Sequence, residues 1–373
     1  MNQKLLHTPE GVRDIYGDEC ARKLAVEDKL HRKLVSFGYE DIQTPTFEYF
    51  DVFSNEIGTT TSRELYKFFD KEGDTLVLRP DFTPSIARCA AKYFMEENVP
   101  IRFCYAGNTF TNTSHLQGKL KEVTQLGAEL IGDASVYGDA EMIHLVIEEL
   151  LGSGLENFQI SIGQVEYFKG LCEEAGIDAD TELSLREYIS AKNYFAAEDL
   201  LLSAGVAEQT RKLLLTTTDM FGSPDALKEA KALVKNERSR QAIERLEQLY
   251  QVLTLYGSEK YISFDLGMLS KYRYYTGIIF KAYTYGIGDA IVKGGRYDGL
   301  LPHFGKEAPA IGFAVVVDDL LEALSRQQVK IDLPDAPRCL TYTTESFPQI
   351  LKEAQELRAQ GVSVRLCREK GEA

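Results

Sequence analysis

The segment VTQLGAELIG, residues 123–132, has the residue types of a binding site for a small polar ligand. On a β-strand, side chains two residues apart share a face, so Gln125, Gly127 and Glu129 lie together and the apolar residues between them face the other way. An amide and a carboxylate on either side of a glycine leave room for a ligand against the backbone. A polar strand facing solvent explains the pattern equally well, so this segment alone leaves both interpretations open.

The segment LRPDFTPSIAR, residues 78–88, places Asp81 and Thr83 where a predicted strand leads into a predicted helix. Both side chains could serve a ligand at the helix start. Capping of the helix by Asp81 explains them without a ligand, because short polar side chains there accept hydrogen bonds from free backbone N–H groups.

Two further segments combine aromatic residues with glycine. In SKYRYYTGIIF, a strand would point Tyr274 and Tyr275 to opposite faces, with Gly277 allowing close approach, although such aromatic pairs are usually part of a core. In KGGRYDGLL, the two glycines predict a bend, and Arg296 and Asp298 predict an ion pair. Each of the four segments is a weak signal when it is taken alone.

The spacing of apolar residues predicts the elements that position these segments. A helix from about residue 18 carries the apolar stripe Val26, Leu30, Leu34 and Phe37, and Gly38 ends it. A second helix covers residues 137–151. Strands are expected at 39–48 with a break at Pro45, and at 74–80, 101–107, 123–132, 157–165, 261–267, 274–285 and 289–301, followed by a strand that runs into a helix over 311–324.

This order predicts two domains. Residues 1–327 form the core, and residues 167–258 are a helical insertion within it because strand signals are almost absent there. Residues 328–373 begin with a linker-like segment and continue as one strand–helix–strand unit. Such a unit is too small to bury a core of its own.

Composition restricts the class of function. The net charge is −15, which gives no basic footprint for nucleic acid. The six cysteines are far apart and the five histidines lack metal-binding spacing, so we expect reduced thiols, a cytoplasmic location, no metal and no cofactor. No apolar run is long enough to span a bilayer, so no membrane association is expected.

Taken in order, the segments resemble the α+β core of class II aminoacyl-tRNA synthetases, in its histidyl-tRNA synthetase version: an antiparallel sheet flanked by helices. GYEDIQTPTFE resembles motif 1, the segment through which such cores form dimers. RFCYAGNTFTN with QLGAELIG resembles motif 2, and IGFAVVVDDLLEAL resembles motif 3. LRPDFTPSIAR, YYTGIIFKAY and GGRYDGL resemble the histidine-specific segments, and the resemblance runs from about Pro9 to Leu324.

The resemblance implies a histidine site. The positions that hold the ammonium group in that family correspond to Asp81, Thr83 and Gln125, and those that hold the imidazole correspond to Glu129 and Tyr275. All five residue types suit these roles. The amine and ring ends of a histidine pocket are therefore expected to be present.

The resemblance also implies that activation chemistry is lost. The three arginines that hold the substrate carboxylate and the ATP phosphates correspond here to Thr111, Ser270 and Asp319. Removal of one such donor commonly costs about 10²–10³ in rate, so the loss of three is expected to abolish adenylation. Arg273 is a candidate replacement cation for the ligand carboxylate.

A histidyl-tRNA synthetase-like core without these cations, with only a short C-terminal unit in place of an anticodon-binding domain, looks like a regulatory subunit of ATP phosphoribosyltransferase. The resemblance implies a non-catalytic chain that a short catalytic subunit requires in the first step of histidine biosynthesis. It further implies histidine as feedback effector, a homodimer within a hetero-oligomer, and no tRNA. A synthetase-like enzyme with a divergent site, including one that acts on another small acceptor, and a stand-alone histidine sensor remain the alternatives.

Overall fold

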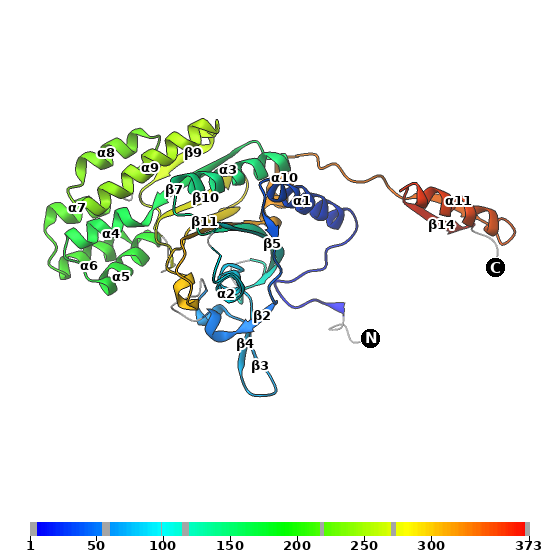
Figure 1. Cartoon of the computed structure of the whole chain (residues 1–373), viewed down its shortest axis with the longest axis horizontal. Coiled ribbons are helices and arrows are strands. Elements are labelled where there is room, and N and C mark those ends of the chain that lie inside the picture. Colours follow the sequence, from blue (N-terminus) through cyan, green and yellow to red (C-terminus); the bar gives the residue numbers. More distant parts are fainter. Residues whose placement is uncertain are drawn as a thin grey trace. The chain divides into compact units, whose positions relative to one another are not determined.

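The computed structural model describes residues 6–53, 60–97, 99–113, 119–216, 220–269 and 274–369. The chain divides into two compact units, Met1–Lys330 and Ile331–Ala373. Within the described residues, the first unit is built on a nine-stranded sheet (Figure 1). Its strands are β1 (Glu40–Asp41), β5 (Ile101–Phe110), β6 (Glu122–Ile131), β7 (Phe158–Gln164), β8 (Phe221–Gly222), β9 (Ile262–Asp265), β10 (Ile278–Thr284), β11 (Val292–Arg296) and β12 (Ala310–Val316).

The strands follow the order β1-β5-β6-β12-β11-β10-β7-β9-β8. Neighbours run antiparallel except for the β1–β5 and β7–β9 pairs, which are parallel. The long β5–β6 hairpin was expected from the sequence, and its register places Gly107 opposite Gln125 and Phe103 opposite Glu129. The expected α+β class and the mainly antiparallel sheet with flanking helices are confirmed.

Three helices pack together against one face of the sheet: α1 (Gly17–Ser36), α3 (Val136–Ser153) and α10 (Val317–Arg326). The predicted stripe of α1 is correct for Val26, Leu30 and Leu34, which are all fully buried. Leu130 of β6 contacts α3 closely, since a side-chain carbon at Gly138 would lie 3.2 Å from it. The apolar residues of β6 therefore face these helices, as their alternation predicts.

The opposite face of the sheet is covered by α2 (Thr83–Tyr93). Phe82, just before α2, stacks on Tyr105 of β5 with ring centroids 4.4 Å apart. Both rings belong to an apolar cluster that also contains Ile86 of α2, Phe103 of β5 and Tyr297. This cluster forms the wall against which the predicted ligand residues lie.

Helices dominate residues 165–255 and lie together beside the β9–β8 end of the sheet (Figure 1). They are α4 (Val165–Glu174), α5 (Ala179–Ser190), α6 (Tyr194–Ser203), α7 (Glu208–Thr216), α8 (Asp225–Leu233) and α9 (Glu237–Leu255). Arg245 of α9 binds the buried Asp139 of α3 through two hydrogen bonds of 2.8 and 2.6 Å, which fasten this region to the core. None of the described helices is long and apolar enough to cross a bilayer.

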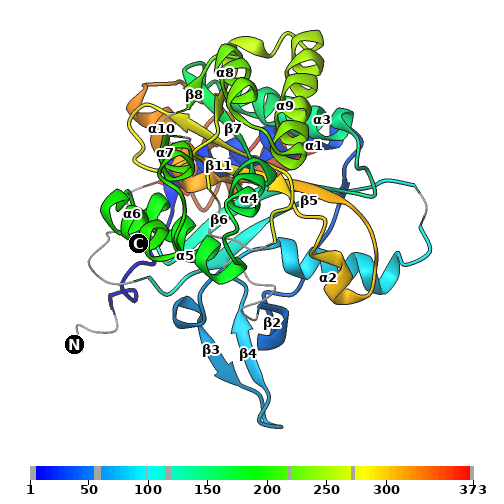
Figure 2. The same cartoon turned by 90° about the vertical axis from the view of Figure 1, so that its left-hand side faces the viewer.

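A smaller antiparallel sheet projects from the first unit (Figure 2). It consists of β2 (Phe47–Tyr49), β4 (Thr75–Leu78) and β3 (Lys67–Phe69), in that order. The ring of Phe47 meets that of Phe68 edge to face, with centroids 5.8 Å apart. Residues 39–49 thus form two short strands separated at Pro45, as the proline predicts.

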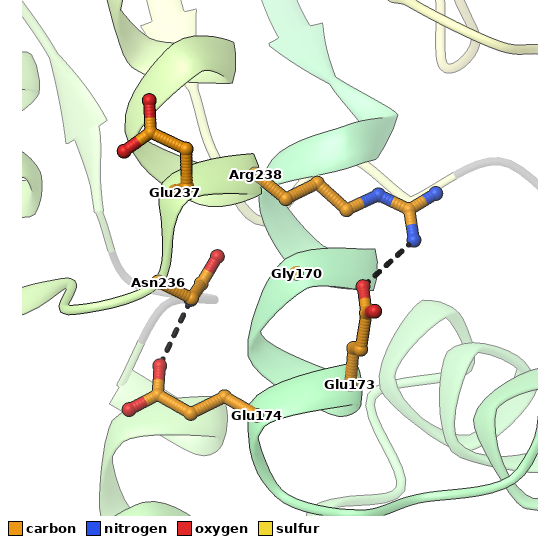
Figure 3. Close-up of a pocket in the computed structure, with 6 residues that line it drawn as sticks. All are labelled: Gly170, Glu173, Glu174, Asn236, Glu237 and Arg238. Carbon is orange, nitrogen blue, oxygen red and sulfur yellow. Dashed lines mark hydrogen bonds and ion pairs between the residues drawn. The ribbon is translucent and has the colours of Figure 1, made fainter.

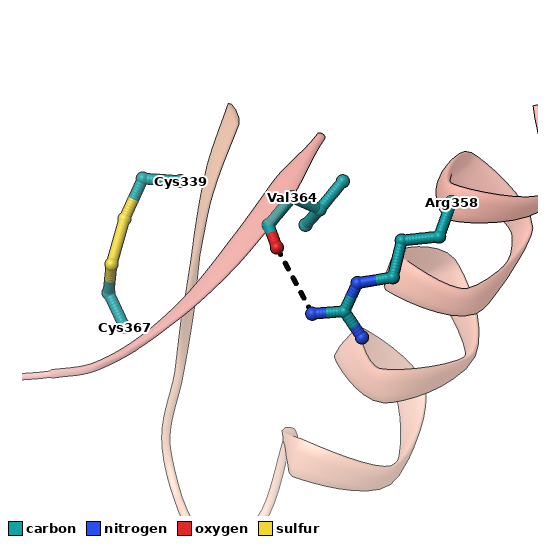
Figure 4. The surroundings of a disulfide bond; sticks show 4 residues. All are labelled: Cys339, Arg358, Val364 and Cys367. Carbon is teal, nitrogen blue, oxygen red and sulfur yellow. Dashed lines mark hydrogen bonds between the residues drawn. A yellow bond between two sulfur atoms is a disulfide. The ribbon is translucent and has the colours of Figure 1, made fainter. Parts of the chain in front are cut away.

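The second unit is one β–α–β motif of β13 (Arg338–Tyr342), α11 (Phe347–Ala359) and β14 (Val364–Arg368), with the two strands parallel. Cys339 and Cys367 are joined by a disulfide whose Cα atoms lie 6.3 Å apart (Figure 4). The prediction that all six cysteines are reduced is wrong for this pair. The two cysteines are 28 positions apart in the sequence, and only the pairing of the two strands brings them together.

Candidate functional site

Glu129 lies near the end of β6 and is only 1% exposed. The hydroxyl of Thr83 donates a hydrogen bond of 2.7 Å to one carboxylate oxygen, and the hydroxyl of Tyr297 donates one of 2.5 Å to the other. Burial raises the pKa of Glu129 to about 8, and it outweighs the two hydrogen bonds, which act in the opposite direction. For Glu129, the alternative of a polar strand facing solvent is therefore wrong.

The space above Gly127 is filled. A side-chain carbon there would collide with the backbone carbonyl of Phe313 and with the phenol of Tyr105. The Tyr105 hydroxyl donates a long hydrogen bond of 3.4 Å to that carbonyl. The room that the sequence suggested for a ligand beside this glycine is thus occupied by Tyr105, and the glycine serves close packing.

The sequence left open whether Asp81 and Thr83 cap a helix or belong to a ligand site, and the structure shows features of both. The carboxylate of Asp81 accepts a 2.8 Å hydrogen bond from the backbone N–H of Thr83, which supports the first turn of α2. The side chain of Thr83 points to Glu129 instead, as its 2.7 Å hydrogen bond requires. The structure therefore brings Asp81, Thr83 and Glu129 together at the start of α2.

Gln125 and Tyr275 lie at the edges of this group. Gln125 is half-buried, four residues before Glu129 on β6 and opposite Gly107. Tyr275 packs over Gly295 of β11, where a side-chain carbon would lie 2.6 Å from its ring. The expected ion pair between Arg296 and Asp298 is confirmed at 3.2 Å.

Two expectations about these aromatic and glycine residues are wrong. Tyr274 and Tyr275 precede β10 and do not alternate across a strand, and their ring centroids lie 4.6 Å apart. Gly294 and Gly295 belong to β11 and form no bend, because their missing side chains make room for the rings of Phe280 and Tyr275. Glycine inside a strand commonly marks such a close approach.

Of the three positions where a synthetase-like site would carry arginine, the described residues include Thr111 and Asp319. Thr111 follows β5 and its N–H donates to the carbonyl of Lys121. Asp319 lies in the first turn of α10, and its pKa is raised by burial and by the neighbouring charge of Asp289. A carboxylate at this position repels a polyphosphate. Ser270 and Arg273, the third position and the suggested replacement cation, lie outside the described residues.

Tyr297 is a site residue that the sequence reasoning missed. Its neighbours in sequence hold it in place: Arg296 donates to Asp139 of α3 with two hydrogen bonds of 2.9 and 2.6 Å, and Asp298 accepts from the backbone N–H of Ala310 at 2.9 Å. Arg296 and Tyr297 face opposite sides of the sheet, since they are successive residues at a strand end. The motif GGRYDGL contained this signal, but only the fold shows that the tyrosine reaches Glu129.

Within the described residues, one group could offer ligands to a metal: His31, Asp41 and Cys104, whose ligand atoms lie within 4.8 Å of one another. His31 and Asp41 already pair directly at 2.7 Å. The pKa of the Cys104 thiol is raised to about 12 by burial and by Asp41. Since the thiolate is the form that binds metals, a His31–Asp41 contact beside a protonated thiol accounts for this group.

A hollow of about 370 Å³ lies between α4 and α9 (Figure 3). Its polar groups pair with one another: Asn236 donates to Glu174 at 2.9 Å, and Arg238 donates to Glu173 at 3.1 Å. A side-chain carbon at Gly170 would lie only 2.4 Å from Ser239 Oγ and 2.6 Å from Asn236 Oδ1, so the two helices are in contact there. The hollow is a helix contact with a polar rim, and none of the predicted site residues lines it.

The chain was compared with known proteins. The family model of histidyl-tRNA synthetase matches residues 11–320. The ATP phosphoribosyltransferase regulatory subunit of Acetivibrio thermocellus is 40% identical over 96% of this chain and 86% of its own length. The protein of the same name from Thermoanaerobacter sp. is 38% identical over 97% of this chain and 94% of its own.

Solved structures give the same result. The crystal structure described as an ATP phosphoribosyltransferase regulatory subunit/histidyl-tRNA synthetase from Bacillus halodurans has a TM-score of 0.89 and 32% identity, and covers 99% of this chain and 94% of its own. The histidyl-tRNA synthetase of Nostoc sp. has a TM-score of 0.81 at 22% identity, over 98% of this chain and 86% of its own. At that identity the second match shows the shared fold alone.

Proposed function

This chain belongs to the ATP phosphoribosyltransferase regulatory subunits within the histidyl-tRNA synthetase family, and we propose that it activates a short catalytic subunit and makes it sensitive to histidine. The catalytic partner condenses ATP with phosphoribosyl pyrophosphate in the first step of histidine biosynthesis. The chain contributes no chemistry of its own. One observation carries this proposal. Glu129 and Thr83, which suit a histidine ligand, are hydrogen-bonded to each other in a buried position, whereas an aspartate, Asp319, stands where a phosphate-binding arginine would be needed.

Histidine is the proposed effector of the retained half-site. A buried carboxyl with Thr83 and Tyr297 hydrogen-bonded to its oxygens suits an imidazole N–H, and Asp81 beside it suits an ammonium group. The feedback mechanism is linkage: histidine would bind two assembly states of the complex with different affinities, and the ratio sets the degree of inhibition. Gln125, Tyr275 and Arg273 remain predicted members of this site.

Loss of adenylation is the second part of the proposal. A triphosphate needs cations that neutralise its charge, and Thr111 and Asp319 supply none. The charges near Asp319 support this conclusion, because Asp289 raises the pKa of Asp319 and the nearby Lys293 is already paired with Asp289. The net charge of −15 likewise supports the absence of tRNA from the proposed partners.

A homodimer within a hetero-oligomer is the proposed assembly. Phe47 and Tyr49 of β2 are 52% and 57% exposed, and Phe68 of β3 joins them on the same face of the small sheet. An exposed aromatic face of this kind is typical of an interface between chains. Phe47 lies within the segment that resembles motif 1. We place the complex in the cytoplasm, where its proposed nucleotide substrates are found.

Co-purification tests the partnership. The tagged chain should retain a short ATP phosphoribosyltransferase catalytic subunit, and histidine should change the size or stability of the complex. A stand-alone histidine sensor would bind histidine but retain no such partner. Histidine-dependent exchange of pyrophosphate into ATP by the chain alone would instead identify an active synthetase-like enzyme.

A further inference from the structure

Arg79 is a buried arginine whose hydrogen bonds hold the segment 44–46, and the family resemblance assigned it no role. It follows β4 and is only 7% exposed. Its backbone N–H donates to the carbonyl of Thr46 at 2.9 Å, and Nη1 donates to the carbonyls of Thr44 at 2.9 Å and Pro45 at 3.4 Å. One residue thus binds three consecutive carbonyls of this segment.

The segment 44–46 is continuous with the proposed dimer surface. It lies between β1 and β2 in the chain and belongs to neither strand. Thr46 directly precedes Phe47, the first residue of β2, and Pro45, Thr46 and Phe47 are all exposed. A second copy that covers Phe47 would therefore also restrain the segment that Arg79 holds.

The other contacts of Arg79 lead to the strand and the helix of the proposed histidine site. Nε donates to the carbonyl of Asn108 at 2.9 Å, and the carbonyl of Arg79 accepts from the N–H of Phe110 at 3.0 Å, so the residue is fixed to β5. The guanidinium carbon lies 4.0 Å from the centroid of the Phe82 ring. Phe82 directly precedes Thr83, whose hydroxyl donates to the buried carboxylate of the site.

An arginine suits a connection between these parts because its guanidinium is a rigid plane with several N–H donors. When one acceptor of such a group moves, the group moves with it and displaces its other contacts. Gly107 of β5 leaves room for the group, since a side-chain carbon there would lie 2.7 Å from Nη2 of Arg79. A movement of the segment 44–46 therefore reaches β5 and the Phe82 ring.

We propose that Arg79 is a positioning residue that couples formation of the homodimer to the binding of histidine, an inference that rests on the proposed function. Contact across the dimer would restrain the segment 44–46 and, through Arg79, order the start of α2 before histidine arrives. A site that is already ordered loses less conformational freedom when its ligand binds. The dimer should therefore bind histidine more tightly than the monomer. Because coupling is reciprocal, histidine should tighten the dimer by the same factor, and about 10-fold lies within the usual range.

Calorimetric titration of the full-length chain with histidine, as dimer and as monomer, measures this coupling. Phe68→Glu supplies the monomer, because it places a charge beside Phe47 on the proposed dimer surface. The native dimer should bind histidine about 10-fold more tightly than Phe68→Glu. When both chains also carry Arg79→Gln, their affinities should agree within about twofold. Arg79→Lys, which can still donate to one carbonyl, should keep part of the ratio.

Sedimentation gives the reciprocal measurement without the Phe68 variant. Saturating histidine should lower the dissociation constant of the native dimer about 10-fold and leave that of Arg79→Gln unchanged within about twofold. A residue that only supports folding would lower stability without changing these ratios. If Arg79→Gln does not fold, Arg79→Lys decides, and a ratio equal to the native one would then refute the coupling.

Arg102→Gln is the matched control, because Arg102 also fixes β5 but binds Glu141 of α3 on the other face of the sheet. It should keep the native ratio. If Arg79→Gln keeps that ratio, or the native chain shows none, the assignment of Arg79 is wrong while the histidine site and the dimer stand. A native chain that binds no histidine would remove the proposed site, one that stays monomeric would remove the proposed dimer, and the coupling falls with either.

Discussion

Glu129 is a carboxyl group held in an enclosed, largely apolar position, where its charged form is disfavoured. Its pKa of about 8 means that it carries a proton over much of the neutral range. A protonated carboxyl can donate a hydrogen bond to a neutral imidazole nitrogen, and an ionised one can accept from an imidazolium. If histidine binds at Glu129 as proposed, its binding is linked to proton uptake or release.

The raised pKa of Glu129 predicts a pH dependence of stability. The folded state holds the proton up to about pH 8, whereas the unfolded carboxyl releases it near its ordinary value of 4.5. Stability from this group is therefore greatest below 4.5 and is lost as the pH rises to about 8. In denaturant unfolding, the free energy of unfolding of the native chain should fall over this pH interval, and that of Glu129→Gln should fall less. The difference should be a few kcal/mol, because one pKa unit corresponds to about 1.4 kcal/mol.

The control for this measurement is Glu187→Gln, which changes an exposed carboxyl on α5. It should follow the native pH profile. Equal slopes for the native chain and Glu129→Gln would mean that Glu129 is ionised in the folded protein.

At the scale of elements, a buried charge cluster joins three parts of the first unit. Asp139 of α3 accepts hydrogen bonds from Arg296 at the end of β11 and from Arg245 of α9. The side chain of Asp139 is 1% exposed. The cluster thus fixes the strand end that presents Tyr297 to Glu129 and attaches the helical region to the same point.

Removal of the central carboxylate should be strongly destabilising. Asp139→Asn leaves Arg245 without its counter-charge and Arg296 with Asp298 alone, and breaking a buried pair in this way commonly costs about 3–5 kcal/mol. The shift of the urea midpoint measures it. Asp225→Asn, which changes a fully exposed carboxylate on α8, should leave the urea midpoint close to that of the native chain. A similar small effect of Asp139→Asn would show that the cluster is not formed.

The Cys339–Cys367 disulfide of the second unit predicts how many cysteine thiols are free before reduction. The structure leaves Cys20, Cys89, Cys104 and Cys172 free. Chain denatured without reductant should therefore react with a thiol reagent at four cysteines, and at all six after reduction. Six reactive thiols before reduction would support the reduced pair that the sequence predicts.

Local patterns predicted most of the elements, because alternation and helical spacing are properties of short segments. The shared face of Gln125 and Glu129 and the stripe of α1 follow from such patterns. The Tyr105 ring above Gly127, the reach of Tyr297 to Glu129 and the guanidinium of Arg79 over Gly107 join segments far apart in the chain. No local spacing encodes these contacts, so the closed form of the site could not be predicted.

At the scale of the whole molecule, the exposed face of the small sheet is the surface that the proposed homodimer would bury. Phe47, Tyr49 and Phe68 share this face, whereas Phe69, 72% exposed, points to the other side of β3. Phe68→Glu should therefore convert a dimer into a monomer in light scattering. Phe69→Glu is the matched control and should remain dimeric. Monomers for both variants and for the native chain would contradict this interface.

The proposed regulatory role has a consequence for the activity of the complete enzyme. A chain that supplies an effector site but no phosphate-binding cations can act only through another subunit. Its effect must then appear as a change in the partner's activity and in the histidine dependence of that activity.

The most direct measurement is ATP phosphoribosyltransferase activity of a short catalytic subunit, assayed alone, with this chain, and with this chain plus histidine. The account predicts little activity for the catalytic subunit alone, high activity with this chain, and inhibition of the complex by histidine. Equal activity with and without this chain would contradict it.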